Sequence, residues 1–446
     1  MSISTNIESA KTIDSSPANA TGRKQVVTAT TASLLGWAFD LFDLFLLLYV
    51  APTVGKLFFP ASSPILQLAA TYASFSVTLL MRPIGSAVFG SYSDRIGRKK
   101  AMIVSVTGVG VSTALFGALP TVEQIGVPAT ILFIALRLIQ GIFVGGVIAS
   151  THTISTETVP PKWRGLMSGL IGGGGAGLGA LFASGWYFVV SSVFPGSSFD
   201  VWGWRVMFYA GIVSAILGIF VYRSLEESPL WLQSKNSDAG KLGKAPVRAV
   251  LSRQYLPILL VNLLIVAGGG TAYYLTSGYL PTFLKIINEL PAGTSSLVLM
   301  TVSIVNIIAS GLVGHASEFL GRRKTMLITG IVCLIGFPVL YAKLAAATDI
   351  ASVYFYASAL VFLGNASYAP VLVFLNERFP TAIRSTGVAL SWNVGFAVGG
   401  MMPTFVSLAS GSIGQIPATL GYFLAGIIIV YLIGTLVISE TKGQLK

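Results

Sequence analysis

The chain has 446 residues, of which 54% are hydrophobic and only 10% are charged, and it carries a formal net charge of +12. Soluble domains average about 25% charged residues, so this composition excludes a soluble globular protein and indicates a chain that lies in lipid. The basic residues are concentrated in short polar segments between apolar runs, a pattern that favours a topological signal over nucleic-acid binding.

Twelve apolar runs follow one another along the sequence. Each is near the length of about 20 residues that a helix needs to cross a bilayer. The runs are residues 29–51, 67–90, 101–120, 127–150, 165–192, 204–222, 256–281, 294–315, 325–346, 351–375, 384–409 and 416–438. They predict an all-α membrane protein with twelve transmembrane helices in two pseudo-symmetric six-helix halves.

The polar segments between these runs predict the domain organisation. We expect a tail at 1–27, a six-helix bundle at 28–222, a central linker at 223–254, a second six-helix bundle at 255–438 and a tail at 439–446. The tail at 1–27 lacks the layout of a cleavable signal peptide. Every second polar segment lies on the same side of the membrane, and Lys and Arg are concentrated in the segments of one side. The positive-inside rule therefore predicts that the linker and both termini are cytoplasmic.

Two short motifs occur once in each half, in the same order. GSYSDRIGRKK begins at Gly90 and GHASEFLGRRK begins 224 residues later, at Gly314, while ETVPPKWRG from Glu157 and ERFPTAIRSTG from Glu377 share a Glu, a Pro and an Arg at equal spacing. Such internal repeats are typical of secondary transporters, whose halves rock around a central site. We interpret both motifs as gating loops, in which carboxylates bind basic groups or a facing helix amino-terminus while one side is shut. The predicted gating residues are Gly90, Asp94, Arg95, Gly97, Arg98, Glu157, Arg164, Glu318, Arg322, Glu377 and Arg384.

Four ionisable residues are expected inside the spans of the first half. Asp40 and Asp43 are three residues apart and share one helix face, Arg82 lies in the second span, and Arg137 lies in the fourth with Gln140 on its face. A charge at the centre of a membrane helix costs about 2.5–3.5 kcal/mol, so each normally faces a partner or a cavity. Either the four neutralise one another, or a carboxylate exchanges the coupling proton while an arginine binds an anionic substrate. We favour the second hypothesis for Asp40 and Asp43 as a unit, and the sequence does not decide which of them carries the proton.

At these motifs the chain resembles the major facilitator superfamily, from about residue 29 to residue 443. The loop G-x-x-x-D-R-x-G-R-K/R, complete from Gly90 and degenerate from Gly314, is specific to that superfamily. RPIGSAVFGSYSDRIGRK and the acid-x-Phe-Asp pattern at Asp40 are similar to the metabolite:proton symporters and the sialate/lactate-type proton symporters. The resemblance implies proton symport by alternating access. Those symporters usually carry a Glu after the glycine pair of the fourth span, where this chain has Val147, so the proton role is expected at Asp40 and Asp43.

The second half offers polar and aromatic groups for a substrate. In the seventh span we expect Gly268 to Gly270 to loosen the helix just before several tyrosines, because broken, Gly/Pro-rich spans are where transporter sites form. Aromatic residues are also common in membrane helices without such a role. The predicted substrate-binding residues are Arg82, Arg137, Gln140, Tyr273, Tyr274, Asn365, Tyr368, Trp392 and Asn393.

These observations predict a symporter that moves protons with a small organic anion, because Arg binds carboxylates in a bidentate fork. A mono- or dicarboxylate or a sugar acid satisfies this pattern. The alternatives are a sugar or polyol transporter, a zwitterionic-osmolyte transporter and a membrane substrate sensor. The sequence has no phosphate-binding loop, metal-ligand spacing or supported nucleophile, so we expect no enzyme activity, cofactor or metal. The expected location is the cytoplasmic membrane, and the expected state is a monomer that binds substrate, protons and lipid but no nucleic acid.

Overall fold

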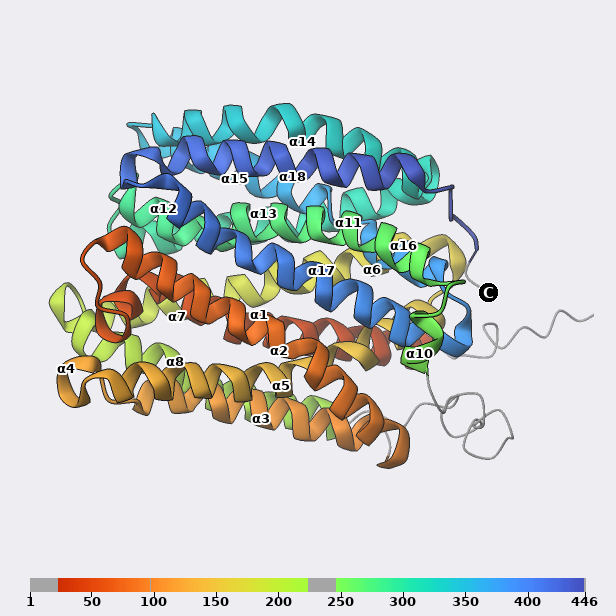
Figure 1. Ribbon diagram of the computed structural model, residues 1–446, viewed down its shortest axis with the longest axis horizontal. Helices are drawn as coiled ribbons and strands as arrows, with labels where there is room; N and C mark the ends of the chain where they lie inside the picture. The colour runs from red at the N-terminus through yellow and green to blue at the C-terminus, as the bar shows by residue number, and fades with distance from the viewer. Residues whose placement is uncertain (1–22, 97, 224–245, 445–446) are drawn as a thin grey trace, which may run out of the picture.

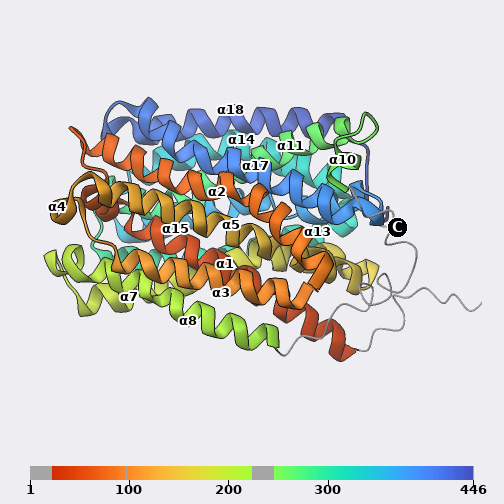
Figure 2. The same ribbon diagram turned by 60° about the horizontal axis from the view of Figure 1, so that its bottom comes forward.

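The computed structural model describes residues 23–96, 98–223 and 246–444 (Figure 1). The predicted tail up to residue 22, the loop residue Gly97, most of the predicted linker (224–245) and residues 445–446 lie outside this part of the chain. The described residues form long helices that run side by side along one axis in both views (Figures 1 and 2). We call the end at which α1 begins and α18 finishes the termini end, and the opposite end the far end.

The first half contains helices α1 to α8, coloured red to yellow-green in Figure 1. Its fifth and sixth passes are composite, because a short π-helical segment interrupts the fifth and another begins the sixth. The elements are α1 (Arg23–Phe58), α2 (Pro64–Ile96), α3 (Arg98–Ala118), α4 (Val122–Ile125), α5 (Val127–Thr158), η2 (Pro161–Trp163), α6 (Arg164–Gly169), η3 (Leu170–Gly174), α7 (Gly175–Val193), η4 (Phe199–Gly203) and α8 (Trp204–Arg223).

The second half contains α11 to α18, coloured green to blue, and its seventh and tenth passes are again composite (Figure 1). A short helix, α10, precedes it. The elements are α10 (Pro246–Val250), α11 (Leu256–Tyr273), η6 (Tyr274–Gly278), α12 (Leu280–Ile286), α13 (Ala292–Leu320), α14 (Arg322–Ala345), α15 (Ile350–Ala366), α16 (Val371–Arg378), α17 (Thr381–Ser410), η7 (Ile413–Gln415) and α18 (Ile416–Val437).

The fold class predicted from hydropathy is confirmed. Among the described residues, nine helical segments are long and apolar enough to cross a membrane. The helices α3, α8 and α17 pack beside them, which is consistent with the predicted twelve passes. The first helix is longer than its predicted span of 29–51, since α1 covers 36 residues.

The two copies of the first repeated motif are not open loops, as the sequence suggested. The α2 helix continues to Ile96 and α3 begins at Arg98, while α13 continues to Leu320 and α14 begins at Arg322. The turn in the second copy is Gly321, whose φ of +92° suits glycine rather than an L side chain. The expectation of a loop was wrong because a continuing helix keeps its own backbone groups hydrogen-bonded up to the membrane surface.

Small residues bring the helices together at two interfaces that matter for the site. In the first half, a Cβ added to Gly145 of α5 would lie 2.2 Å from the backbone oxygen of Arg82 in α2. Between the halves, a Cβ on Gly169 of α6 would lie 2.2 Å from the backbone oxygen of Ser310 in α13. Close backbone approach at glycine is the usual way in which membrane helices gain packing contacts. The contact at Gly145 therefore sets the position of Arg82.

We predict that Gly145→Val destabilises the protein and displaces Arg82, because the added side chain has no room against α2. Overpacking a tight contact costs about 1–3 kcal/mol or more. The matched control is Gly185→Val in α7, where an added Cβ meets nothing within 4 Å. Thermal unfolding of the purified protein in detergent should show a lower Tm for the first variant and little change for the control. Equal losses in both variants would contradict this account of the α2–α5 contact.

Candidate functional site

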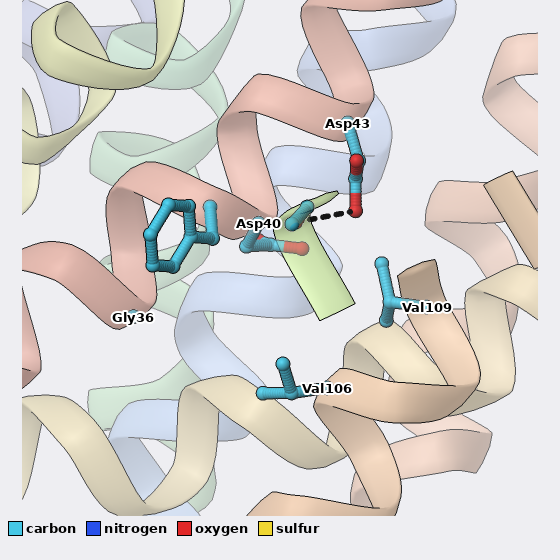
Figure 3. A pocket seen from close by; sticks show the side chains of 7 residues that line it. Gly36, Asp40, Asp43, Val106 and Val109 are labelled. Atoms are coloured by element: carbon cyan, nitrogen blue, oxygen red, sulfur yellow. Dashed lines mark hydrogen bonds between the residues drawn. The ribbon is translucent and has the colours of Figure 1, made fainter. Parts of the chain in front are cut away.

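The predicted carboxylate pair lies together in the interior of the first half. Asp40 and Asp43 of α1 both line a cavity of about 10 Å³. Figure 3 shows their side chains on one side of this cavity, with Val106 and Val109 of α3 across from them. The other lining residues are Gly36, Phe39 and Ser214. The prediction that the two acids share one face of the first span is confirmed.

The two carboxyl groups have different partners. A nitrogen of Arg82 lies 3.6 Å from Asp40 Oδ2, and their side chains are 3% and 1% exposed. Asp43 Oδ2 accepts a long hydrogen bond of 3.4 Å from Ser214 Oγ in α8. Both oxygens of Asp40 and Oδ1 of Asp43 are buried and receive no hydrogen bond from the described residues. Arg82 and Asp40 thus form a buried ion pair.

Arg137 is held differently, between α5 and α3. Its Nη1 donates to Gln140 Oε1 at 2.7 Å, and Gln140 Nε2 donates to Thr113 Oγ1 at 2.8 Å. Its guanidinium carbon lies 4.2 Å from the ring centroid of Phe116 and 5.3 Å from that of Phe133. In the described part of the chain Arg137 forms no ion pair, and its Nε and Nη2 have no hydrogen-bond partner. The hypothesis that the four charges simply pair off therefore fits Arg82 and Asp40 but not Arg137.

Aromatic side chains from both halves meet at the middle of the interface, and we call this group the central aromatic cluster. Trp392 and Phe396 of α17 stack at 4.3 Å, and Trp37 of α1 meets Trp392 edge to face at 6.1 Å. Tyr273 and Tyr368 stack at 5.8 Å. Phe45 and Tyr274 also contact rings of the cluster. All seven side chains are buried.

Arg82 faces this cluster from the first half. On the same side of α2, Phe75 lies seven residues before Arg82 and meets Tyr274 edge to face at 5.5 Å, and Ser86 lies four residues after it and accepts a hydrogen bond from Asn393 of α17. The structure therefore places the Arg82–Asp40 ion pair beside the aromatic side chains of the opposite half. This arrangement sets a cation and a carboxylate beside apolar rings and tyrosine hydroxyls.

The structure brings together some of the predicted substrate residues and separates others. Tyr273, Tyr274, Tyr368 and Trp392 belong to the central aromatic cluster, whereas Arg137 and Gln140 lie inside the first half. Asn365 donates to Val361 O at 2.9 Å within its own half, and Asn393 Nδ2 donates to Ser86 Oγ of α2 at 3.2 Å across the interface.

Sequence reasoning missed several residues of the site. They are Trp37, Phe45, Phe396, Thr113 and Ser214. Trp37 lies three residues before Asp40, and this spacing could have placed both on one helix face. Nothing in the apolar run around Ser214 marks that hydroxyl, since its contact with Asp43 depends on how α8 packs on α1.

The seventh pass is interrupted, but not at the glycines. The α11 helix continues through Gly268 to Gly270, and the π-helical segment begins only at Tyr274. A Cβ on Gly268 would lie 2.5 Å from Tyr431 Cβ, so this glycine allows α18 to approach. The prediction that the glycines loosen the helix was wrong, because here the absence of a side chain lets a neighbouring helix pack closely while the helix itself continues.

The predicted gating residues of the second half form an ionic cluster at the termini end, which we call the termini latch. A nitrogen of Arg322 lies 2.8 Å from Glu318 and 3.0 Å from Glu377. Glu318 also accepts a hydrogen bond of 2.5 Å from the backbone N–H of Gly165 in α6, which joins the two halves. Arg164, the first residue of α6, directly precedes Gly165. These contacts close the halves against each other at this end.

The other predicted gating residues have different outcomes. The Nε of Arg384 donates to Phe379 O at 3.2 Å. The structure does not describe residue 97 or the side chains at 94, 95, 98 and 157, so the predictions for Asp94, Arg95, Gly97, Arg98 and Glu157 lie outside the described residues, as does that for Gly90.

The carboxyl-terminal segment completes the termini latch, which the sequence did not predict. Thr441 Oγ1 donates to Glu377 Oε2 at 2.8 Å. The Glu440 carboxylate accepts the backbone N–H groups of Arg322 at 2.8 Å and Arg323 at 3.2 Å, at the amino-terminus of α14. A carboxylate is stabilised at a helix amino-terminus by the unpaired N–H groups and the helix dipole.

The far end is closed by a smaller contact between the halves. Tyr72 of α2 donates to Thr282 Oγ1 of α12 at 2.8 Å, and its ring stacks on that of Tyr279 at 5.1 Å. The two halves therefore meet at the termini end, at the central aromatic cluster and at the far end.

We predict that Glu440→Gln weakens the termini latch in a pH-dependent way. Partial burial raises the pKa of Glu440, but backbone hydrogen bonds lower it by a larger amount, so the pKa lies below the ordinary value of 4.5. The donors of these bonds are the N–H groups of Lys442, Arg322, Arg323 and Thr441. An acid whose pKa is lowered on folding stabilises the fold above its unfolded pKa, and this stabilisation disappears as the pH falls through its folded pKa. The Tm of Glu440→Gln should therefore lie below that of the wild type at pH 7, and the difference should shrink below about pH 4.

The control for this prediction is Glu123→Gln, an exposed acid of the short helix α4 at the far end. Its Tm should follow the wild type throughout. A Tm difference for Glu440→Gln that grows as the solution is acidified would contradict the prediction.

Comparisons with known proteins agree with this architecture. A family model described as Major Facilitator Superfamily matches residues 28–403. The inner membrane metabolite transport protein YhjE of Escherichia coli is 30% identical over 422 residues, which cover 93% of this chain and 94% of YhjE. The glycine betaine/proline/ectoine/pipecolic acid transporter OusA of Dickeya dadantii is 27% identical, with 93% of this chain and 84% of OusA covered. The citrate-proton symporter of Klebsiella pneumoniae is 29% identical over 371 residues, with 82% of each chain covered.

A solved structure shows the same fold. The proton:xylose symporter XylE bound to 6-bromo-6-deoxy-D-glucose superposes with a TM-score of 0.76 at 17% identity, covering 94% of this chain and 97% of XylE. The resemblance stated from the sequence motifs is confirmed. With its matched residues, its helical membrane architecture and its transporter relatives, the chain belongs to the major facilitator superfamily.

Proposed function

We propose that the protein moves a small organic anion together with protons across the cytoplasmic membrane by alternating access. The observation that carries this proposal is the buried Arg82–Asp40 ion pair, whose two helices also bring Phe75 and Trp37 against rings of the central aromatic cluster. The citrate-proton symporter among the relatives couples a carboxylate to protons by name, which supports the same class of transport here. The substrate is a mono- or dicarboxylate or a sugar acid.

The ion pair supplies a coupling mechanism. When Asp40 is ionised it neutralises Arg82, and a substrate carboxylate must displace it. When Asp40 takes up a proton, Arg82 becomes a buried cation without a counter-ion, which favours binding of an anion in a bidentate fork. Because such coupling is reciprocal, a bound carboxylate also raises the affinity of Asp40 for its proton. Proton and anion therefore load and leave together.

We assign the remaining residues by their positions. Asp43 is a second proton-binding group, since it lines the same cavity as Asp40. Tyr273, Tyr274, Tyr368 and Trp392 hold the body of the substrate. Arg137 stabilises the packing of α5 against α3 through Gln140, instead of binding substrate.

The gates follow from the contacts at the two ends. The termini latch faces the cytoplasm, in the orientation that the positive-inside rule predicts. Release of Glu318 from Gly165 would separate α13 from α6 and open this side, while release of Tyr72 from Thr282 would open the far side. Since both contacts lie within one chain, a monomer is sufficient for the cycle.

A zwitterionic osmolyte is the second candidate substrate. Aromatic faces bind quaternary ammonium groups through cation–π attraction, and the relative from Dickeya dadantii is named for betaine and proline. A betaine would place its carboxylate on Arg82 and its ammonium group among the rings of the central aromatic cluster.

We predict that Asp40→Asn and Asp43→Asn each abolish uphill transport, because neither amide can exchange a proton with the buried site. The measurement is uptake by proteoliposomes of labelled lactate, succinate, gluconate, an aromatic acid, glucose and betaine, with and without an imposed proton gradient. Carboxylate accumulation in the wild type that needs the gradient supports the proposal. Glu123→Gln serves as the control and should transport normally. Gradient-independent equilibration of glucose, unaffected by either substitution, would rule out proton–anion symport.

We predict a different result for each arginine. Arg82→Lys loses the bidentate geometry and should raise the KM for the carboxylate by about tenfold or more, equivalent to about 1.4 kcal/mol. Arg137→Lys should leave the KM near that of the wild type and lower the Tm, since it loses its contacts with Gln140 and Phe116. Initial uptake rates and thermal unfolding distinguish the two. A raised KM in Arg137→Lys alone would move the substrate carboxylate to that residue.

A further inference from the structure

We propose that the cavity between Asp40 and Asp43 binds a single water molecule, and that this water passes the coupling proton from one carboxyl group to the other. The inference rests on the proposed function, because it describes the path of the proton within the same site. It places the proton path inside the first half, apart from the substrate path between the halves.

The size and lining of the cavity suit one water molecule. Its volume is about 10 Å³, close to the minimum of about 10–15 Å³ that a water molecule requires. The walls contributed by Phe39, Val106 and Val109 are apolar, so the polar groups that line it are the two carboxyl groups and the Ser214 hydroxyl. These supply the two to four polar partners that a buried water needs.

The unpaired oxygens of the two carboxyl groups also indicate a bound water molecule. Asp40 Oδ1, Asp40 Oδ2 and Asp43 Oδ1 are buried acceptors without a donor in the described residues, although Arg82 lies 3.6 Å from Asp40 Oδ2. Buried acceptors are nearly always satisfied by protein or by ordered water. One water has two O–H groups, and it can donate one to each carboxyl group that lines the cavity.

The water also permits proton transfer with a simple balance. The O–H bond of protonated Asp43 breaks as a bond forms to the water oxygen, while an O–H bond of the water breaks as one forms to the Asp40 carboxylate. The water is regenerated, and one proton has moved from Asp43 to Asp40. Arg82 then loses its counter-ion and becomes available to the substrate.

The charged groups around the cavity are consistent with proton transfer from Asp43 to Asp40. The α2 helix presents Arg82 to Asp40, α3 presents Val106 and Val109, and α8 presents Ser214. On α5 the charged group is Arg137, whose partner Gln140 binds Thr113, about one helical turn from Val109 along α3. Asp40 has the ion-pair partner, so its charge state controls Arg82, and Asp43 serves as the proton donor to it.

The test fills the cavity without changing an ionisable group. Val109→Ile adds one methylene at the cavity wall, and Val111→Ile is the matched control, because Val111 is on the same helix and is 50% exposed. The two measurements are proton-driven accumulation of the carboxylate and exchange of labelled for unlabelled substrate, in which the proton need not leave the carrier. We expect Val109→Ile to lower accumulation by about tenfold or more relative to exchange, and Val111→Ile to keep the wild-type ratio.

A spectroscopic measurement detects the water itself. The infrared difference spectrum between acidic and neutral pH should contain a water O–H band that shifts in H₂¹⁸O, present in the wild type and Val111→Ile and absent in Val109→Ile. If Val109→Ile does not fold, Val106→Ile fills the same cavity from one turn away. This band does not depend on any transported substrate, so it separates failure of the water site from failure of the proposed symport.

Three outcomes would overturn the inference. The first is accumulation by Val109→Ile at the wild-type level. The second is an equal loss of accumulation and exchange in a variant that keeps the wild-type Tm, which would mean that the cavity has no specific role in moving the proton. The third is accumulation driven by a sodium gradient with no dependence on protons, which would mean that the cavity binds a metal cation.

Discussion

A charge buried in the membrane must be compensated, and the Arg82–Asp40 ion pair is where this constraint shapes the protein. The pair is almost wholly buried at 3.6 Å, and removing one partner of such a pair costs about 3–5 kcal/mol, because the other charge is left uncompensated. The contact of α2 with α5 at Gly145 places Arg82, and the first helix carries Asp40 to meet it. In the mechanism that we propose, a proton or a substrate carboxylate substitutes for one partner, and for this reason the pair couples the two.

The two buried arginines illustrate different solutions to the same constraint. Arg82 is compensated by a carboxylate that can be protonated, so its environment changes with the proton. Arg137 is compensated by an amide and by two aromatic faces, none of which titrates. In the proposed mechanism a site built on Arg82 can therefore switch, whereas the surroundings of Arg137 stay constant through the transport cycle. This difference is the reason for assigning the substrate to Arg82.

The termini latch solves a related problem at the membrane surface. Arg322 binds two carboxylates, and Glu440 and Thr441 extend the network to the carboxyl-terminal segment. Because Glu318 also binds Gly165 of the opposite half, rearrangement of one ionic cluster can be transmitted to the packing of α13 on α6. The far-end contact of Tyr72 with Thr282 is smaller and uncharged, so the two ends are closed by different chemistry.

Hydropathy, charge distribution and the paired motifs were sufficient to predict the helical membrane class, the superfamily and the acids of the first helix. These features follow from the chain alone, because the bilayer sets the length of an apolar run and excludes unpaired charges. The domain boundaries, the site roles and the orientation of the termini remain predictions. Only the tertiary structure decided that Arg82 pairs with Asp40, that Ser214 reaches Asp43, that Gly268 serves packing and that Glu440 caps α14. A helix in lipid is apolar on most of its surface, so its sequence does not reveal which neighbour each face meets.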